Sequence, residues 1–244
     1  YTAEPFLDAE GNLTWREGIT STGDSSVLRG VDDPFALQGG LCVLQGNLGK
    51  SIVKSSAVAA ERHVIEGEVR IFHSQEQMLD AFKRGELYRD VIVVVRFQGP
   101  RANGMPELHK LLPPLQAAQS RGHKVALVTD GRLSGASGDV LSAIHLTPEA
   151  AEGGPIARLR DGDRLLIDAI SGELTALVDA AEWNHRRPVT EDLSASQFGT
   201  GRELFRMFRN AVGPADRGAS IFSTPHLEPA LTESFEPEGE LATN

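Results

Sequence analysis

The sequence predicts an α/β fold, in which buried strands alternate with helices. Two apolar runs, VIVVVRF at 91–97 and a second run at 124–129, lack the polar alternation of a half-exposed strand. Strands that are covered on both faces have this composition. Each run leads into a glycine-containing polar loop, at 98–107 and at 130–140. Because ligands bind at strand ends in open α/β sheets, we expect the two loops to share one edge and to form a site there.

Other strands are predicted on both sides of these two runs. Short β-branched runs at 42–44, 52–53 and 64–72 are separated by glycines, as strands joined by turns are. The segment 161–179 predicts a hairpin, because its first half alternates and Ser171 and Gly172 supply a tight turn.

The most clearly marked helix begins after Ser74. This serine stands three residues before Gln77, which is the spacing of a capping box, and an apolar stripe follows as far as Gly85. Three further helical segments are expected, one interrupted or kinked by Pro113 and Pro114 and two more at 179–187 and 201–210.

The composition along the chain suggests three parts. Residues 1–40 are polar and predict an irregular lead-in, 41–212 carry the elements of a folded domain, and 213–244 are rich in proline, glutamate and serine. We expect this last part to be a polar tail or linker that is partly disordered. The sequence begins at Tyr1 without a methionine, so we expect it to be a piece of a longer protein.

Composition and charge exclude several classes of protein. The 244 residues are 40% hydrophobic, which is enough for a real core, and the formal net charge of −10 argues against a nucleic-acid partner. No apolar stretch approaches the ~20 residues that span a bilayer, so we expect a soluble, cytoplasmic protein. The single cysteine, Cys42, excludes an internal disulfide framework and cannot by itself hold an iron–sulfur cluster.

The segment GNLGKS at 46–51 has the ending of a phosphate-binding loop. That motif needs a glycine five residues before Gly49, and Leu44 stands there instead. The residues that follow are β-branched, so no helix N-terminus is offered to a phosphate. A tight turn between two strands is the better interpretation.

A serine hydrolase is a second possibility, because Ser134 and Ser137 lie among glycines at a strand end. The nucleophile elbow requires Gly-x-Ser-x-Gly. Arg132 stands two residues before Ser134, and Asp139 stands two residues after Ser137, so neither serine fits the motif.

A third possibility uses one serine as a base. Forming a serine alkoxide requires nearby positive charge, which a metal ion usually supplies. Glu107, at the end of the other loop, is a suitable hard ligand for Mg²⁺. Both residues also have ordinary interpretations, since Glu107 would suit the first turn of a helix and Ser134 would suit a turn.

Three long motifs identify a family. They are LQGNLGKSIVKSSAV at 44–58, GPRANGMPELHKL at 99–111 and DLSASQFGTGRELF at 192–205, and the segment 126–163 accompanies them. Together they strongly resemble the carboxy-terminal part of the dihydroxyacid dehydratase and phosphogluconate dehydratase family, with a closer likeness to its phosphogluconate branch. The likeness covers about residues 1–219.

The resemblance implies both a fold and an activity. The fold is a swivelling β/β/α domain, a mixed-strand barrel flanked by helices. The activity is removal of water from 6-phosphogluconate, a small phosphorylated sugar acid, to give 2-dehydro-3-deoxy-6-phosphogluconate in the Entner–Doudoroff pathway. In such enzymes a cubane or two-iron cluster acts as Lewis acid on the C3 hydroxyl, Mg²⁺ or Mn²⁺ steadies the carboxylate and the C2 hydroxyl, and a serine takes the C2 proton.

Carried over onto this sequence, the resemblance makes Glu107 a metal ligand and Ser134 the base. Ser137 belongs to the sugar-acid form of the loop and is a candidate for binding substrate hydroxyls, and Arg132 is a candidate for binding a carboxylate or phosphate. Arg202 is expected to open a helix at 201–210 and to contact the substrate phosphate there, although plain capping by its neighbour Thr200 is the more ordinary interpretation.

Other polar residues in these loops have ordinary interpretations. Arg101 suits either an anion or a structural ion pair, and Asn103 suits a turn. His109 follows Glu107 by two positions and would point away from it on a helix. His145 is expected to be a hydrogen-bonded core histidine.

The resemblance also implies what this chain lacks. The cluster cysteines and the other metal ligands belong to an amino-terminal domain, so we expect this part alone to be inactive and the whole enzyme to be a homo-oligomer. A dehydratase for another sugar acid or dihydroxy acid stays open as an alternative. So does a non-catalytic binding module that has kept the fold without the chemistry.

Overall fold

The structure is a computed structural model that describes residues 3–36, 39–134 and 139–222. It divides into two compact units, one up to Gly39 and one from Gly40 onward.

The amino-terminal unit contains a β-hairpin. Strands β1 (Ala3–Leu7) and β2 (Leu13–Glu17) pair antiparallel, and the Asp8 carboxylate accepts the Asn12 amide at 2.8 Å across the turn. The expectation that 1–40 is irregular throughout is therefore wrong. Charged residues in both strands and Pro5 in β1 obscure the pairing in the sequence, because neither strand has the apolar run that marks β6 or β7.

Within the described part of the second unit, eight strands close into a mixed barrel in the order β10-β3-β4-β8-β7-β6-β5-β9. The β5–β6, β6–β7, β7–β8 and β3–β10 pairs are parallel, and the β3–β4, β4–β8, β5–β9 and β9–β10 pairs are antiparallel. The α/β class and the mixed barrel are thereby confirmed. The strands are β3 (Leu41–Gly46), β4 (Gly49–Lys54), β5 (Val64–Phe72), β6 (Val91–Val95), β7 (Val125–Thr129), β8 (Leu141–Thr147), β9 (Arg164–Asp168) and β10 (Glu173–Ala176).

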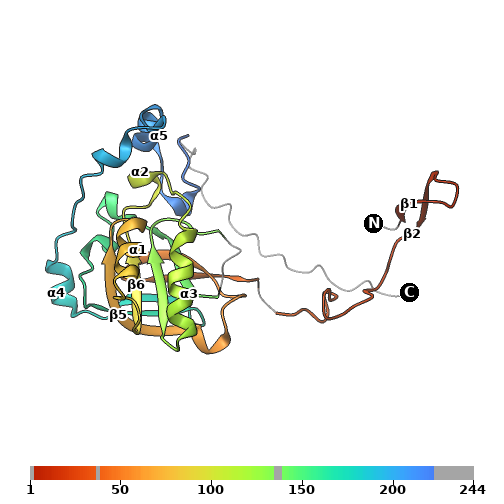
Figure 1. The fold of residues 1–244 in the computed structure, drawn as a ribbon, viewed down its shortest axis with the longest axis horizontal. Helices are drawn as coiled ribbons and strands as arrows, with labels where there is room; N and C mark the ends of the chain where they lie inside the picture. Colours follow the sequence, from red (N-terminus) through yellow and green to blue (C-terminus); the bar gives the residue numbers. More distant parts are fainter. Residues whose placement is uncertain (1–2, 37–38, 135–138, 223–244) are drawn as a thin grey trace, which may run out of the picture. The chain divides into compact units, whose positions relative to one another are not determined.

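Short helices join and flank the strands. They comprise η1 (Ala60–Arg62), α1 (Gln75–Lys83), α2 (Pro100–Asn103), η2 (His109–Leu111), α3 (Leu112–Ser120), η3 (Ala150–Glu152), η4 (Pro155–Arg158), α4 (Ala180–His185), η5 (Ser194–Gln197), η6 (Arg202–Phe205), α5 (Arg206–Ala211) and η7 (Ala215–Arg217). In Figure 1, α1 and α3 lie beside β5 and β6 on one side of the barrel.

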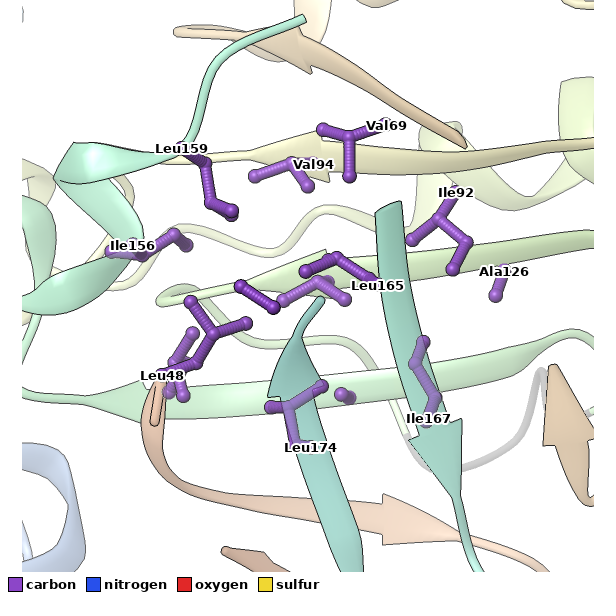
Figure 2. Packing of buried hydrophobic residues seen from close by; sticks show 14 of the residues in the cluster. Leu48, Val69, Ile92, Val94, Ala126, Ile156, Leu159, Leu165, Ile167 and Leu174 are labelled. Atoms are coloured by element: carbon purple, nitrogen blue, oxygen red, sulfur yellow. The ribbon is translucent and has the colours of Figure 1, made fainter. Parts of the chain in front are cut away.

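Strand β6 explains why the run at 91–97 shows no alternation. Ile92 and Val94 belong to the core inside the barrel, where they meet residues of other strands such as Leu165 (Figure 2). Val93 faces the other way, into a second core that includes Met78 of α1 and Leu115 of α3. Both faces of β6 are buried, as the sequence predicts.

Several predicted details are confirmed. Ser74 caps α1 by accepting the Gln77 amide, and the 46–51 segment forms the turn between β3 and β4 rather than a phosphate loop. The hairpin at 161–179 is β9–β10, and the helix at 179–187 is α4. Pro113 and Pro114 lie in the first turn of α3, where a missing N–H costs nothing, so they do not kink it.

The carboxy-terminal tail begins later than expected. Residues 213–222 contain η7, the Gly213 amide donates to the Ser220 carbonyl at 2.8 Å, and Asp216 lies 3.9 Å from Lys50 of β4. The segment is therefore folded, because local turns and an ion pair hold it despite its polar composition. Residues 223–244 lie outside the described residues.

The barrel core offers a stability test. Ile92→Val removes one buried methylene, so we expect the free energy of unfolding to fall by about 0.5–1.5 kcal/mol. Urea unfolding followed through the buried Trp183 measures this change. Ile170→Val, at an isoleucine that is 75% exposed, is the matched control and should stay within about 0.5 kcal/mol of the parent. Equal losses in the two variants would contradict the assignment of Ile92 to the core.

Candidate active site

The loops that follow β6 and β7 are in direct contact. Glu107 and Arg132 form an isolated parallel bridge, and the Leu108 amide donates to the Arg132 carbonyl at 3.2 Å. Strands β6 and β7 are parallel neighbours, so their carboxyl ends deliver both loops to the same edge of the barrel, as the sequence predicts.

This contact brings Glu107 and Ser134 together. The backbone amide of Ser134 donates to Oε1 of Glu107 at 2.8 Å. Ser134 is exposed, and the Glu107 side chain keeps 30% of its surface accessible. A carboxylate and a serine from two different loops therefore meet at the rim of the barrel. Ser137 lies outside the described residues.

Arg132 belongs to the same contact. Its Nε donates to the Met105 carbonyl at 3.0 Å, and its Nη2 lies 3.8 Å from Oε2 of Glu107. Met105 has a positive φ of 51°, so the loop turns sharply just before Glu107. The guanidinium holds this turn and places a positive charge beside the carboxylate.

A buried carboxylate supports the base of the site. Asp130, directly after β7, is fully buried and accepts the amides of Phe97 at 3.1 Å, Gln98 at 2.9 Å and Ala150 at 2.9 Å. Burial raises the pKa of Asp130, and the three N–H donors oppose that rise. Asp130 thus ties together the segments that follow β6, β7 and β8.

A second buried carboxylate, that of Glu149, binds backbone amides of α2. Glu149 is 4% exposed and accepts the Arg101 amide at 2.7 Å and the Ala102 amide at 3.0 Å. Gly99 makes room for it, since a Cβ there would lie 2.3 Å from Oε2 of Glu149. Burial, with the nearby charges of Asp130 and Glu152, raises the pKa of Glu149 to about 7.

This raised pKa predicts a pH-dependent stability. In the unfolded chain Glu149 titrates near its ordinary pKa of 4.5, so between pH 4.5 and about 7 the folded state binds the additional proton. Stability is therefore expected to fall as the pH rises through this window, by up to about 3 kcal/mol from this group. Urea unfolding of the chain from pH 4.5 to 8 measures the slope.

Two variants separate Glu149 from the other carboxyls. Glu149→Gln is expected to flatten the slope, although it is less stable at pH 5 because its amide nitrogen faces a backbone donor. Glu152→Gln removes the ion pair with Arg101 at 3.3 Å and one of the charges that raise the pKa of Glu149, but it should keep most of the slope because burial is the largest cause of that rise. A Glu149→Gln variant with the unaltered slope would show that Glu149 does not titrate there.

Beside the rim lies a cleft of about 470 Å³ whose lining includes Glu107, Asn103 and Arg202. Arg202 Nη2 donates to Oδ1 of Asn103, whose Nδ2 donates to Gln98 Oε1 at 2.9 Å. Gln98 Nε2 in turn donates to the His73 carbonyl at 2.8 Å. The chain of amides orients Arg202 toward the loop that carries Glu107.

The local structure around Arg202 differs from the expected helix at 201–210. Residues 202–205 form the short 3-10 helix η6, and only 206–211 are α-helical, as α5. Gly201 is left-handed, and the Gly199 amide donates to Oε1 of Glu203 at 2.9 Å, without a cap from Thr200. The expected single helix at 201–210 is therefore wrong, and the short 3-10 turn gives no support to a phosphate site on a helix N-terminus. The Arg202 side chain stays a candidate.

The cleft also contains a hydrogen bond between His73 and Glu191 that sequence reasoning missed. His73 Nδ1 lies 2.7 Å from Oε2 of Glu191, and Arg96 Nε donates to His73 Nε2 at 3.1 Å. Because the guanidinium can only donate, the His73 proton sits on Nδ1 and points at Glu191. His73 is thus saturated by its two partners. The two residues are 118 positions apart, so no local pattern indicates the pair.

Other candidates have structural roles. Arg101 pairs with Glu152 at 3.3 Å, which is the ion-pair alternative, and Asn103 relays the contact of Arg202. His145 is half-buried with a positive φ of 56°, and its backbone amide donates to the Gly131 carbonyl at 2.9 Å. Burial and the charge of Arg132 lower the pKa of His145.

The described residues of this chain offer few ligands for a metal ion or an iron–sulfur cluster. Glu107 offers one hard oxygen ligand, but the described residues contain no group of three His, Cys, Asp or Glu side chains that could hold a metal ion. Cys42 packs against the barrel core, with Sγ 3.5 Å from the Val43 carbonyl. One partly buried thiol does not fit an iron–sulfur cluster, which needs several.

The fold and this rim define a class of protein: a mixed α/β barrel that carries a loop carboxylate and a loop serine in contact at its edge. Residues 26–219 match the family described as dihydroxy-acid/6-phosphogluconate dehydratase, C-terminal. The chain belongs to this family, and the resemblance drawn from its motifs is confirmed.

Individual relatives agree. The chain is 57% identical over 225 residues to a phosphogluconate dehydratase of Pseudomonas aeruginosa, covering 91% of this chain and 36% of that protein. It is 54% identical over 223 residues to the phosphogluconate dehydratase of Escherichia coli K12, covering 91% and 37%. A dihydroxy-acid dehydratase of Nitratidesulfovibrio vulgaris is 38% identical over 204 residues, covering 80% and 35%. The chain thus spans little more than a third of the length of these relatives.

Among the residues described, none of the helices has the length and apolar character needed to cross a membrane.

Proposed function

We propose that this chain is the carboxy-terminal part of a hydro-lyase that converts 6-phospho-D-gluconate to 2-dehydro-3-deoxy-6-phospho-D-gluconate and water. The observation that carries the proposal is the contact between the Ser134 amide and Glu107 at 2.8 Å, in a chain 57% identical to a phosphogluconate dehydratase. The step would lie in the Entner–Doudoroff pathway, in the cytoplasm.

In the proposed reaction Ser134, ionised to its alkoxide, accepts the proton from C2 of the substrate. The electrons of the C2–H bond form the C2–C3 double bond of an enol, and the C3 hydroxyl leaves with the electrons of the C3–O bond. Transfer of the proton from Ser134 to this hydroxide gives water and restores the alkoxide, and the enol then tautomerises to the 2-keto acid. Ser134 is exposed at the rim and its backbone is anchored through Glu107, so the residue has a defined position while its side chain stays accessible to a substrate. Positioning of this kind is what general-base catalysis requires.

Glu107 would supply one ligand to Mg²⁺ or Mn²⁺. Its carboxylate is a hard donor that keeps accessible surface toward the cleft, which fits such an ion, and the remaining ligands would come from outside this chain. A bound divalent cation supplies positive charge to the substrate carboxylate and the C2 hydroxyl. The Ser134 amide and Arg132 orient the carboxylate that holds it.

The departing C3 hydroxyl needs a group that this chain does not supply. The sole thiol, Cys42, does not fit a cluster, so an iron–sulfur cluster would be held by the amino-terminal part of the enzyme. We therefore expect this chain alone to be inactive. We also propose that the complete enzyme acts as a homo-oligomer.

Three side chains are proposed to bind substrate. Arg132 stands beside Glu107 and suits the substrate carboxylate, Arg202 faces the cleft and suits the phosphate, and Ser137 suits a substrate hydroxyl.

Turnover by the full-length protein tests the proposal. After anaerobic reconstitution of iron and sulfide, with Mg²⁺ or Mn²⁺ present, 2-keto acid formation is measured with 6-phosphogluconate, gluconate and a 2,3-dihydroxy acid. The phosphorylated substrate is expected to give the highest kcat/KM. A higher kcat/KM for another acid would show that this acid represents the substrate class of the enzyme. Absence of turnover on all three acids would favour a non-catalytic module.

A further inference from the structure

A second cavity shares two lining residues, Asn103 and Arg202, with the cleft. Its volume is about 340 Å³, within the range of small-molecule sites, and its lining includes Asn103, Gly104 and Met105 of the Glu107 loop. Two arginines, Arg202 and Arg209, also line it. The remaining lining is mostly apolar, contributed by Phe205, Phe208, Val212 and Ile221.

Arg209 is incompletely satisfied. Its Nη1 donates to the Arg202 carbonyl at 3.0 Å, whereas its Nη2 is buried without a hydrogen-bond partner. The pKa of Glu203 is lowered mainly by the hydrogen bond that its Oε1 accepts from the Gly199 amide, with a smaller effect of the Arg209 charge. The described residues provide no carboxylate within ion-pair distance of Arg209. A buried donor on a cation without a partner is costly, which indicates that an acceptor completes it.

Arg202 adds a second positive charge to the same cavity. Within the part of the chain that the structure covers, its side chain contacts only a neutral acceptor, Oδ1 of Asn103, and forms no ion pair. Two guanidinium groups that lack carboxylate partners and share one cavity favour an anion, and their planar forks suit phosphate oxygens.

We propose that Arg209, together with Arg202, forms the subsite for the phosphate group of the substrate and thereby determines the preference for phosphorylated sugar acids. This inference rests on the proposed function and deepens it by naming the second arginine. One loop, 99–107, forms a wall of this cavity and also carries Glu107, so the two anionic ends of one substrate would meet the same loop.

The test compares three variants of the full-length enzyme on 6-phosphogluconate and gluconate. Arg209→Met is expected to lower kcat/KM for 6-phosphogluconate by about 10- to 100-fold, mainly through KM, and to leave gluconate within about twofold. Arg209→Lys keeps the charge without the fork and should fall between Arg209→Met and the parent. Arg206→Met, at an exposed arginine of the same helix, should match the parent on both substrates.

Binding of inorganic phosphate provides a readout that does not depend on turnover. The parent enzyme should bind phosphate in competition with 6-phosphogluconate, and Arg209→Met should bind it about 10-fold or more weakly by calorimetry. Unchanged selectivity and unchanged phosphate binding in Arg209→Met would overturn the subsite. If that variant does not fold, the same two readouts on Arg209→Lys decide.

The two proposals fail separately. If the parent enzyme turns over none of the acids, the proposed function fails, while phosphate binding still tests the arginine pair. If the parent dehydrates 6-phosphogluconate and the variants keep its selectivity, only the arginine pair is wrong.

Discussion

Ser134→Ala in the full-length enzyme is expected to lower kcat by about 10²- to 10⁴-fold, the usual contribution of a positioned general base. KM should change little, because the proposed role of the hydroxyl is to accept the C2 proton and not to bind the ground state. The backbone amide that Ser134 donates to Glu107 survives the substitution, so the rim keeps its geometry. Steady-state formation of the 2-keto acid measures the loss.

A second readout separates the base from a structural serine. Exchange of the C2 proton of the substrate with D₂O, followed by NMR, should disappear in Ser134→Ala if the hydroxyl accepts that proton. Ser120→Ala is the matched control, since Ser120 Oγ only donates to the Ala117 carbonyl at the end of α3, and it should keep full activity. A Ser134→Ala enzyme within threefold of the parent would refute the assignment.

The elements that sequence predicts best are those whose signal is local. Strands β6 and β7 are buried on both faces and read as unbroken apolar runs, and the cap of α1 is set by two residues three positions apart. Strand β8 was not predicted. Its burial pattern loses alternation at Ile144 and His145, which are both partly exposed, and its pairing with β4 shifts register between Lys50 and Ile52, near the positive φ of His145.

In the candidate site, too, some features could be predicted from local sequence and others could not. The loops that carry Glu107 and Ser134 follow strands that could be predicted, so their shared edge follows from topology. The carboxylates beneath them could not be foreseen, because Glu149 bonds amides 47 and 48 residues earlier in the chain and Asp130 bonds amides 32 and 33 residues earlier. Only the closed barrel brings these segments together. Arg209 is likewise singled out by its buried, unpaired nitrogen and by no motif.

Glu107→Gln tests the metal ligand and is expected to lower kcat/KM by more than about 100-fold. Loss of a residue that merely orients a metal ligand costs about 10- to 100-fold, and loss of the ligand charge should cost at least as much. The amide oxygen of glutamine can still accept the Ser134 amide, so the substitution removes charge while it keeps the loop contact.

The dependence on metal distinguishes a ligand from a structural acid. If Glu107 binds Mg²⁺ or Mn²⁺, the concentration of metal that gives half-maximal activity should rise at least 10-fold in Glu107→Gln, and excess metal should restore part of the activity. Glu152→Gln, on the neighbouring η3, should respond to metal as the parent does. If Glu107→Gln loses activity with an unaltered metal requirement, the carboxylate instead acts by holding the Ser134 loop, and the metal assignment is wrong.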